Sequence, residues 1–205
     1  MESLETERLI LRPWELEDAD FVLDLYSRWE VQRFIGNHPQ VMRDRDEAEE
    51  RIRTWRNMVH PIHAIWAVQL KGPGQLKGPG EPKAPGGTKG QAQQSGPLAG
   101  TLLLKSIPAS GDTLPLLPSG DTEIGWHFHP DHWGHGYATE AAAAVLAYAL
   151  VTGPDKTGLD KVVAVTAPAN TASQKVCERI GMTHRGQTNR YYNALCELYE
   201  VEAPR

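Results

Sequence analysis

Residues 123–150 read EIGWHFHPDHWGHGYATEAAAAVLAYAL, and this stretch sets the expected fold. It passes from an alternating strand pattern at 122–128, through a turn with small residues at 134, 136 and 138, into an Ala-rich helix at about 137–150. Small residues let the backbone turn tightly, and the first N–H groups of a helix lack internal partners and attract anions. The stretch therefore predicts either a cradle for a phosphate group or a purely structural tight turn.

Further strands and helices are expected on both sides of this stretch. Alternating or apolar runs predict strands at 7–13, 63–70, 100–107, 161–166, 183–186 and 194–201, and helical periodicity predicts helices at 15–29, 44–58 and 170–180. The strand at 161–166 (KVVAVT) is almost wholly apolar, as is typical of a strand covered on both faces. The order of elements predicts an α/β (α+β) fold, with a mixed central sheet of about six to seven strands flanked by about four helices.

The charge balance excludes several classes of protein. The chain has 205 residues and a net charge of −5. An acidic protein is a poor non-specific binder of nucleic acid, which requires clustered Lys and Arg, and suits a cationic or neutral partner better. The sequence has no run of about 18 apolar residues, which argues against a membrane span, and its first residues lack the layout of a signal peptide. With two cysteines, it predicts a reducing, cytoplasmic setting.

Residues 71–97 differ in composition from the rest of the chain. They hold 8 of the 19 Gly and 5 of the 15 Pro, repeat QLKGPG at 69–74 and 75–80, and carry four Lys against one Glu. Such a composition cannot bury enough apolar surface to offset ordering entropy, and an insert in a loop costs little stability. We therefore expect one domain over residues 1–205, interrupted at 71–97 by a flexible hairpin insert.

Three segments together resemble one family. EIGWHFHPDHWGHGYATEA at 123–141 and NTASQKVCERIGM at 170–182 resemble the GNAT acyl-CoA N-acyltransferases, and ETERLILRPWELEDAD at 5–20 is similar to the opening of their RimJ/RimL-like branch. The resemblance covers nearly the whole chain except 71–97 and part of 108–120. It implies the GNAT fold, acetyl-CoA or coenzyme A as donor, and transfer of an acetyl group directly to a primary amine.

The resemblance leaves the acceptor open between a protein N-terminus and a small amine, and the acidic body suits a cationic acceptor in either case. It also leaves a homodimer open. The alternative function, from a different class, is a catalytically silent acyl-CoA-binding regulatory module that keeps the same fold.

The resemblance implies that the donor lies along the strand and turn of residues 123–150 and beside the helix at 170–180. Backbone amides of the turn would hold the pyrophosphate, and the strand would run beside the pantetheine arm. These donor-binding positions are Ile124, Gly125, Trp126, His127, Gly134, His135, Gly136, Tyr137, Ala138, Thr139, Asn170 and Ser173.

Two positions depart from the family pattern. Cys177 stands where many relatives have a Tyr that protonates the leaving thiolate, so Ser173 becomes the expected proton donor. Asp131 stands where the family's phosphate motif often begins with Arg or Gln, so we expect no side-chain contact to phosphate there.

The base that accepts the amine proton is expected on the strand at 122–128. Alternation places Glu123, Gly125 and His127 on one face, with their neighbours facing the core. Glu123 is the first choice, directly or through water, and His127 is the second because an imidazole pKa lies near working pH. A strand N–H near Trp126 would polarise the thioester carbonyl. The alternatives are that Glu123 is a half-exposed carboxylate paired with a loop Arg, and that the Ser173 hydroxyl bonds back to its own helix.

The resemblance implies that the connection between the first two helices lines the acceptor side, so Trp29 and Phe34 are candidates for acceptor contact. Tyr191, beside Tyr192 in the loop NRYYNA, is a further candidate. Because the strands are expected to run antiparallel, the 71–97 connection should lie at the same edge of the sheet as the phosphate turn. The 108–120 connection should lie at the opposite edge, near the acceptor.

The histidines at 127, 129, 132 and 135 have a spacing that suits a metal. Their run crosses a strand and a turn, so the rings would diverge, and we expect no metal site.

Overall fold

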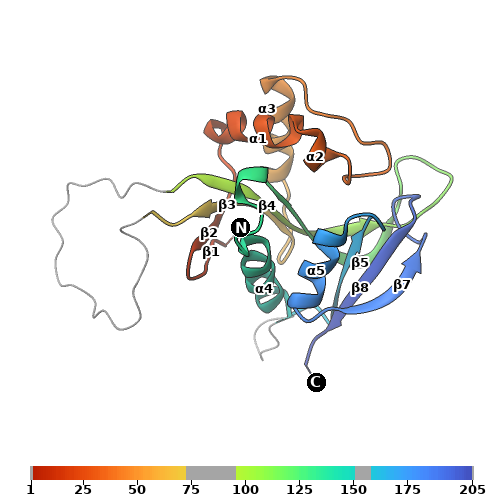
Figure 1. The fold of residues 1–205 in the computed structure, drawn as a ribbon. Helices are drawn as coiled ribbons and strands as arrows, with labels where there is room; N and C mark the ends of the chain where they lie inside the picture. Colours follow the sequence, from red (N-terminus) through yellow and green to blue (C-terminus); the bar gives the residue numbers. More distant parts are fainter. Residues whose placement is uncertain (1, 73–95, 151–157, 205) are drawn as a thin grey trace.

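The computed structural model describes residues 2–72, 96–150 and 158–204 (Figure 1). Within these ranges eight strands form one mixed sheet in the order β1-β2-β3-β4-β5-β6-β8-β7. The strands are β1 (Leu4–Glu5), β2 (Leu9–Arg12), β3 (Ala64–Leu70), β4 (Leu98–Pro108), β5 (Pro118–Phe128), β6 (Lys161–Thr166), β7 (Thr183–Thr188) and β8 (Cys196–Glu202). Every neighbouring pair is antiparallel except β5 and β6, which are parallel.

Helices cover both faces of this sheet. The first group is α1 (Ala19–Ser27), α2 (Trp29–Gln32) and α3 (Arg45–Arg56), and the second is α4 (Tyr137–Leu150) and α5 (Thr171–Arg179). Figure 1 shows the first group on one side of the sheet and the second on the other. Two short 3-10 turns, η1 (Leu16–Asp18) and η2 (Pro130–His132), lead into helical or loop segments.

Each face of the sheet has its own hydrophobic core. On one face, α4 packs Ala141, Ala142, Val145 and Ala149, all fully buried, against the strands. Their small side chains let the helix approach the sheet closely, since interiors are packed to crystal-like density. On the other face, α1 and α3 bury a cluster that includes Trp14, Tyr26 and Ile52. Both faces of the central strands are therefore covered, which explains the nearly continuous apolar sequence of β6.

The sheet opens between β5 and β6. These two strands are paired at Glu123 and Val163 alone, whereas β6 pairs with β8 along all six of its residues. Beyond Glu123, the side of β5 that faces β6 therefore has no strand partner. An unpaired strand edge offers N–H and C=O groups to another extended chain. This divergence creates the opening in which the candidate site lies.

The expected mixed sheet is confirmed, with one strand more than predicted. The additional strand is β1, which has two residues and is too short to show alternation in the sequence. The connection expected at 108–120 is shorter than predicted, because β4 extends to Pro108 and β5 begins at Pro118.

The helix expected at 15–29 is divided. It is a 3-10 turn followed by α1, and the chain then becomes extended at Arg28 (φ −82°, ψ 119°) before α2 begins. The change of direction buries Val31 and leaves Trp29 57% exposed. The helix predicted to reach residue 29 therefore ends at Ser27, and Trp29 lies outside its buried face.

The predicted insert at 71–97 lies largely outside the described residues, because 73–95 are not among them. Its two ends are close together: Gln69 is opposite Leu98, and the Leu70 N–H donates to Pro97 O at 2.9 Å. On β4, Gly100 is opposite Phe128, where β5 ends before the turn at 134–136. The described ends of this segment therefore lie at the same edge of the sheet as the turn at 134–136, as the strand order predicted.

Candidate functional site

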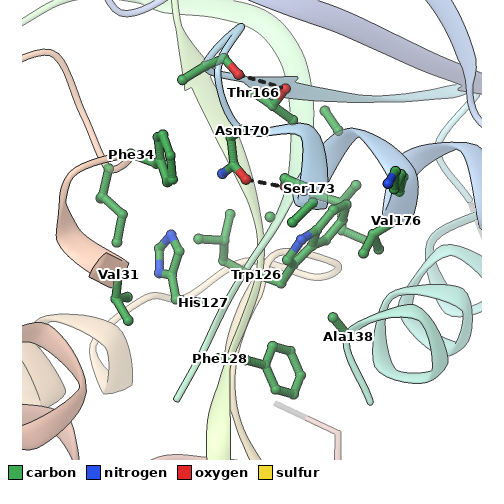
Figure 2. Close-up of a pocket in the computed structure, with 18 of the residues that line it drawn as sticks. Val31, Phe34, Trp126, His127, Phe128, Ala138, Thr166, Asn170, Ser173 and Val176 are labelled. Carbon is green, nitrogen blue, oxygen red and sulfur yellow. Dashed lines mark hydrogen bonds between the residues drawn. The ribbon is translucent and has the colours of Figure 1, made fainter. Parts of the chain in front are cut away.

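A cavity of about 1250 Å³ occupies the opening between β5 and β6. It is lined by β5, the turn at 132–140, β6, α5 and residues 33–36 after α2. Figure 2 shows side chains from these elements converging on it. All twelve residues predicted to bind the donor line the cavity: Ile124, Gly125, Trp126, His127, Gly134, His135, Gly136, Tyr137, Ala138, Thr139, Asn170 and Ser173. We call this cavity the donor cleft.

The turn before α4 requires glycine at two positions. Gly134 and Gly136 have φ values of +78° and +80°, in the left-handed region that other residues rarely adopt. The Glu140 N–H donates to Gly136 O at 3.0 Å and closes the first turn of α4. The N–H groups that precede it, from Tyr137 to Thr139, belong to the first turn and have no helical acceptor. The glycines are therefore structurally required, and the turn they shape presents free amides to the cleft.

Arg8 is a cation at this turn that the sequence analysis did not identify. Its Nη1 donates to His135 O at 3.0 Å, and its Nε donates to Glu140 Oε2 at 2.7 Å. Its guanidinium lies 4.8 Å from the ring centroid of Tyr137, and its side chain remains 40% exposed. Two further cations, Lys175 and Arg179 of α5, also line the cleft. Although the whole chain is acidic, these charges suit an anionic ligand.

Glu140 anchors the start of α4 to the opening segment of the chain. Its Oε1 accepts hydrogen bonds from Arg8 N at 2.8 Å and Thr6 Oγ1 at 2.5 Å. Burial favours the protonated carboxyl, but the hydrogen bonds from Thr6 and Arg8 outweigh it and lower the pKa of Glu140. Glu140 is therefore ionised at neutral pH and holds Arg8 beside the turn.

The alternation predicted for β5 is present. Ile124 and Phe128 belong to the core under α4, while Glu123, Gly125 and His127 lie on the other face, opposite Lys105, Leu103 and Thr101 of β4. A Cβ at position 125 would lie 3.1 Å from Leu103 Cδ1. Glycine at this position keeps the middle of the strand open between Glu123 and His127.

Glu123 is buried in a three-residue network rather than half-exposed beside a loop arginine. Its Oε1 accepts a 2.6 Å hydrogen bond from the Tyr192 hydroxyl and lies 3.2 Å from Lys105 Nζ. Lys105 Nζ also donates to Tyr192 Oη at 2.8 Å. Burial raises the pKa of Glu123, and the charge of Lys105 and the Tyr192 hydrogen bond partly oppose the rise. The carboxylate thus lies in the cleft with a pKa moved towards working pH.

His127 has a different environment from the one expected. Its Nδ1 lies 2.9 Å from the Tyr26 hydroxyl, which donates to Thr101 Oγ1 at 3.0 Å. Burial, helped by the charges of Arg51 and Lys105, lowers the pKa of His127 to about 3. The expectation of a pKa near 7 was therefore wrong. His127 stays neutral at physiological pH and is a much weaker proton acceptor than Glu123.

Asn170 and Ser173 lie together at the start of α5. The Asn170 side chain caps the helix, because its Oδ1 accepts the Ser173 N–H at 3.2 Å (Figure 2). The Ser173 hydroxyl makes no hydrogen bond to its helix or to any other described residue, so the bond back to the helix that we considered is not formed. Cys177, one turn later, is fully buried, and burial raises the pKa of its thiol to about 12.

Of the three residues expected to contact the acceptor, Phe34 lines the cleft and the other two do not. Trp29 is exposed and is not among the residues that line the cleft. Tyr191 is buried, with its hydroxyl donating to Asp121 at 2.7 Å, and its neighbour Tyr192 enters the cleft instead. Tyr192 and Asn193 have φ values of 59° and 52°, a left-handed pair that sequence alternation does not predict.

The four closely spaced histidines do not converge on one point: the rings of His132 and His135 both pack against Tyr137. His127 contacts Tyr26, whereas His129 Nε2 lies 3.1 Å from Asp24 Oδ2. Within the described ranges, no three His, Cys, Asp or Glu side chains are grouped to hold a metal ion. In the same ranges, no helix combines the length and the apolar character needed to cross a bilayer.

Comparison with known proteins agrees with this geometry. A family model for the acetyltransferase (GNAT) domain matches residues 8–183. The uncharacterized N-acetyltransferase p20 of Bacillus licheniformis is 26% identical over 201 residues, which cover 98% of this chain and 93% of p20.

Solved structures share the arrangement of the backbone. A GNAT-family acetyltransferase from Bacillus anthracis has a TM-score of 0.66 at 22% identity, over 98% of this chain and 99% of that one. The RimL ribosomal L7/L12 alpha-N-protein acetyltransferase, solved with coenzyme A, has a TM-score of 0.64 at 15% identity, over 98% of each chain.

Proposed function

The chain belongs to the GNAT acetyltransferase family, and we propose that it transfers the acetyl group of acetyl-CoA directly to a primary amine. The main observation behind this proposal is that three features line the same cleft. They are the open edge of β5, the free amides before α4 and the buried carboxylate of Glu123. This combination supports an extended anionic donor and a proton acceptor in the same place.

The donor would bind along two elements of the cleft. The amides of residues 134–139 suit the pyrophosphate, because a helix N-terminus favours an anion, and Arg8 lies close enough to the turn to add charge. The pantetheine arm would run beside Ile124–His127, where β5 has no strand partner, and use the backbone groups that β6 leaves unpaired. The thioester would then lie towards Asn170 and Ser173 at the start of α5, which line the same cleft.

The amine must lose a proton as it attacks the thioester carbonyl. A primary amine is mostly protonated at neutral pH, so a carboxylate with a raised pKa is a suitable acceptor. Glu123 would take this proton, directly or through one water, while Tyr192 and Lys105 hold its carboxylate in place. His127 does not fill this role, because its pKa is far below working pH.

The thiolate of coenzyme A leaves as the tetrahedral intermediate collapses. A strand N–H near Trp126 would stabilise the oxyanion of that intermediate. The Ser173 hydroxyl, with no partner of its own in the described chain, would donate a proton to the departing sulfur. Cys177 is buried below the surface of α5 and supplies no acid.

The acceptor class is tested by measuring thiol release from acetyl-CoA across a panel of amines and peptides, with mass spectrometry of the products. Acetylated peptide N-termini would place the chain beside RimL, whose name records action on ribosomal L7/L12. Acetylated small amines would make it a small-molecule enzyme. Tight binding of acetyl-CoA without turnover of any amine would favour the silent acyl-CoA-binding module instead.

A further inference from the structure

A second cavity, of about 320 Å³, lies between α3 and the sheet. Its volume is in the range of small-molecule sites, roughly 300–1,000 Å³. It is lined by residues of α1, α3, β3, β4 and β5, among them Tyr26, Arg51, Trp55 and Ile65, and by Met58 after α3. We call it the side cavity.

The side cavity adjoins the donor cleft at a shared wall. Leu103, Lys105 and His127 line both spaces. On the sheet, Lys105 is directly opposite Glu123 and Leu103 is directly opposite Gly125. An acceptor whose amine approaches Glu123 above Gly125 therefore has the side cavity next to it, on the face of the sheet away from α4.

The walls of the side cavity are largely apolar and aromatic. Tyr26 and Ile65 are buried, and the rings of Tyr26 and Trp55 lie 6.0 Å apart. Met58 adds an unbranched side chain that adapts to irregular ligands. Such walls suit an aliphatic or aromatic arm, since removing apolar surface from water is favourable.

The charged groups of the side cavity are all positive. Among the described residues that line it, Arg51 and Lys105 are cations and none is acidic. Lys105 is already bonded to Glu123 and Tyr192. Arg51 lies 5.0 Å from the ring centroid of Tyr26 and pairs with no carboxylate of the described chain.

Other arginines of the same helix behave differently from Arg51. Arg45 and Arg53 both pair with Glu49, at 3.1 Å and 2.7 Å, on a surface that does not line the side cavity. Arg51 is thus the α3 cation that lines the side cavity. It has no carboxylate partner among the described residues. A second cation brought beside it and Lys105 would be repelled, whereas an anion would be attracted.

We propose that the side cavity binds the arm of the amine acceptor, and that this arm is apolar and ends in an anionic group held by Arg51. The proposal rests on the transfer of an acetyl group to an amine and specifies its substrate class. It reverses the expectation from net charge, because the charged groups that line the side cavity are positive although the whole chain is acidic.

The test compares three acceptors with six carbons each: hexylamine, 6-aminohexanoate and 1,6-diaminohexane. We expect kcat/KM to be highest for 6-aminohexanoate and lowest for 1,6-diaminohexane. Arg51→Ala should lower kcat/KM for 6-aminohexanoate by about ten-fold or more, the size expected for a lost charge-assisted hydrogen bond, and leave hexylamine and the KM of acetyl-CoA unchanged. Arg51→Lys should retain part of the preference, and Arg53→Ala, on the same helix, should retain all of it.

A binding measurement separates this proposal from the proposed transferase activity. Titration of hexanoate and of hexylamine is followed by tryptophan fluorescence, with Trp55→Phe assigning the signal, and needs no turnover. Hexanoate binding that is lost in Arg51→Ala supports the anionic subsite, even if no amine is acetylated. The absence of acetylation would count only against the proposed transferase activity. Equal or stronger binding of hexylamine, or an unchanged acceptor order in Arg51→Ala, would overturn the proposal while leaving the transferase intact.

Discussion

The Tyr192 hydroxyl donates a 2.6 Å hydrogen bond to Glu123 Oε1, across 69 positions of sequence. Lys105 Nζ reaches both residues, at 2.8 Å and 3.2 Å, so the three side chains form a closed network. Tyr192 makes this contact from a left-handed backbone conformation, with φ of 59°. Strained backbone is retained where the surroundings over-determine it, often at functional sites. The network therefore links an unusual loop conformation to the proposed base.

Replacing the proposed base should remove one limb of the pH profile. Glu123→Gln is expected to lower kcat/KM by about 100-fold at pH 7–8, a typical loss for general acid–base catalysis. Burial raises the pKa of Glu123, so wild-type activity falls as the pH decreases through that raised value and the carboxylate is protonated. The measurement is kcat/KM against pH with a single amine, whose own protonation is the same for both proteins. A variant with full activity at every pH would remove Glu123 from the mechanism.

Removing the Tyr192 hydroxyl should shift the acid limb of the pH profile rather than abolish it. The hydrogen bond favours the ionised form of Glu123, so Tyr192→Phe is expected to raise the carboxyl pKa and shift the acid limb to higher pH. The ring, which lies 5.2 Å from Lys105 Nζ, would remain in place.

Tyr191→Phe is the matched control for this shift. It loses a hydrogen bond to Asp121 outside the donor cleft, and should lower stability without moving the pH profile. If both variants shift the profile equally, the effect comes from the loop and not from the bond to Glu123.

The glycine turn is tested by adding a methyl group. Gly136→Ala must hold alanine at φ +80°, which costs roughly 1–2 kcal/mol if the conformation is kept. We expect a weaker affinity for coenzyme A by calorimetry and a raised KM for acetyl-CoA, with the KM for the amine unchanged.

Gly186→Ala imposes the same strain elsewhere. Its φ is +88°, at the register shift between β7 and β8, and nothing lies within 4 Å of the added Cβ. This variant should lose similar stability and keep its affinity for coenzyme A. A weakened affinity in both variants would mean that general destabilisation explains the result.

Glu140 should contribute stability that depends on pH. Because the hydrogen bonds from Thr6 and Arg8 lower its pKa in the folded protein, this contribution is present above the ordinary carboxyl pKa of about 4.3. It is lost as the pH falls through the lowered value. Glu140→Gln is expected to reduce the free energy of unfolding by about 1–3 kcal/mol at pH 7, and the difference from wild type should shrink in acid.

Urea denaturation at pH 7 and at successively lower pH measures this difference. Glu50→Gln serves as the control, since the exposed pair of Glu50 with Arg53, at 3.8 Å, should contribute less than about 1 kcal/mol. A loss in Glu140→Gln that stays constant down to the lowest pH would contradict the assignment of the ionised carboxylate.

The proton donor to the thiolate is tested at α5. Ser173→Ala should lower kcat by about 100-fold if the hydroxyl is the main acid, with little change in the affinity for coenzyme A. Cys177→Ala should keep kcat, because the thiol is buried and its pKa is raised to about 12. Stopped-flow measurement of thiol release reports the step directly, and an unaltered rate in Ser173→Ala would assign the proton to water or to another group.

Much of the fold and of the donor cleft follows from local sequence. Alternation over 122–128 correctly placed Glu123 and His127 on one face of β5, because successive side chains of a strand point in opposite directions. The glycines at 134 and 136 and the alanines of α4 indicated a tight turn into a closely packed helix, and both are present. These features depend on neighbouring residues, so the sequence alone could reveal them.

The environment of each reactive group was decided by tertiary structure. Glu123 receives its partners from β4 and from the loop before β8, and Arg8 reaches the turn from the opening segment. Burial by distant elements moves the pKa of Glu123 up and that of His127 down, although both lie on one strand. In a loop with left-handed backbone, Tyr192 rather than Tyr191 lines the donor cleft, and the position of α3 brings Arg51 to the side cavity. Such contacts join residues far apart in the chain, and desolvation and charge act through space, so no local pattern records them.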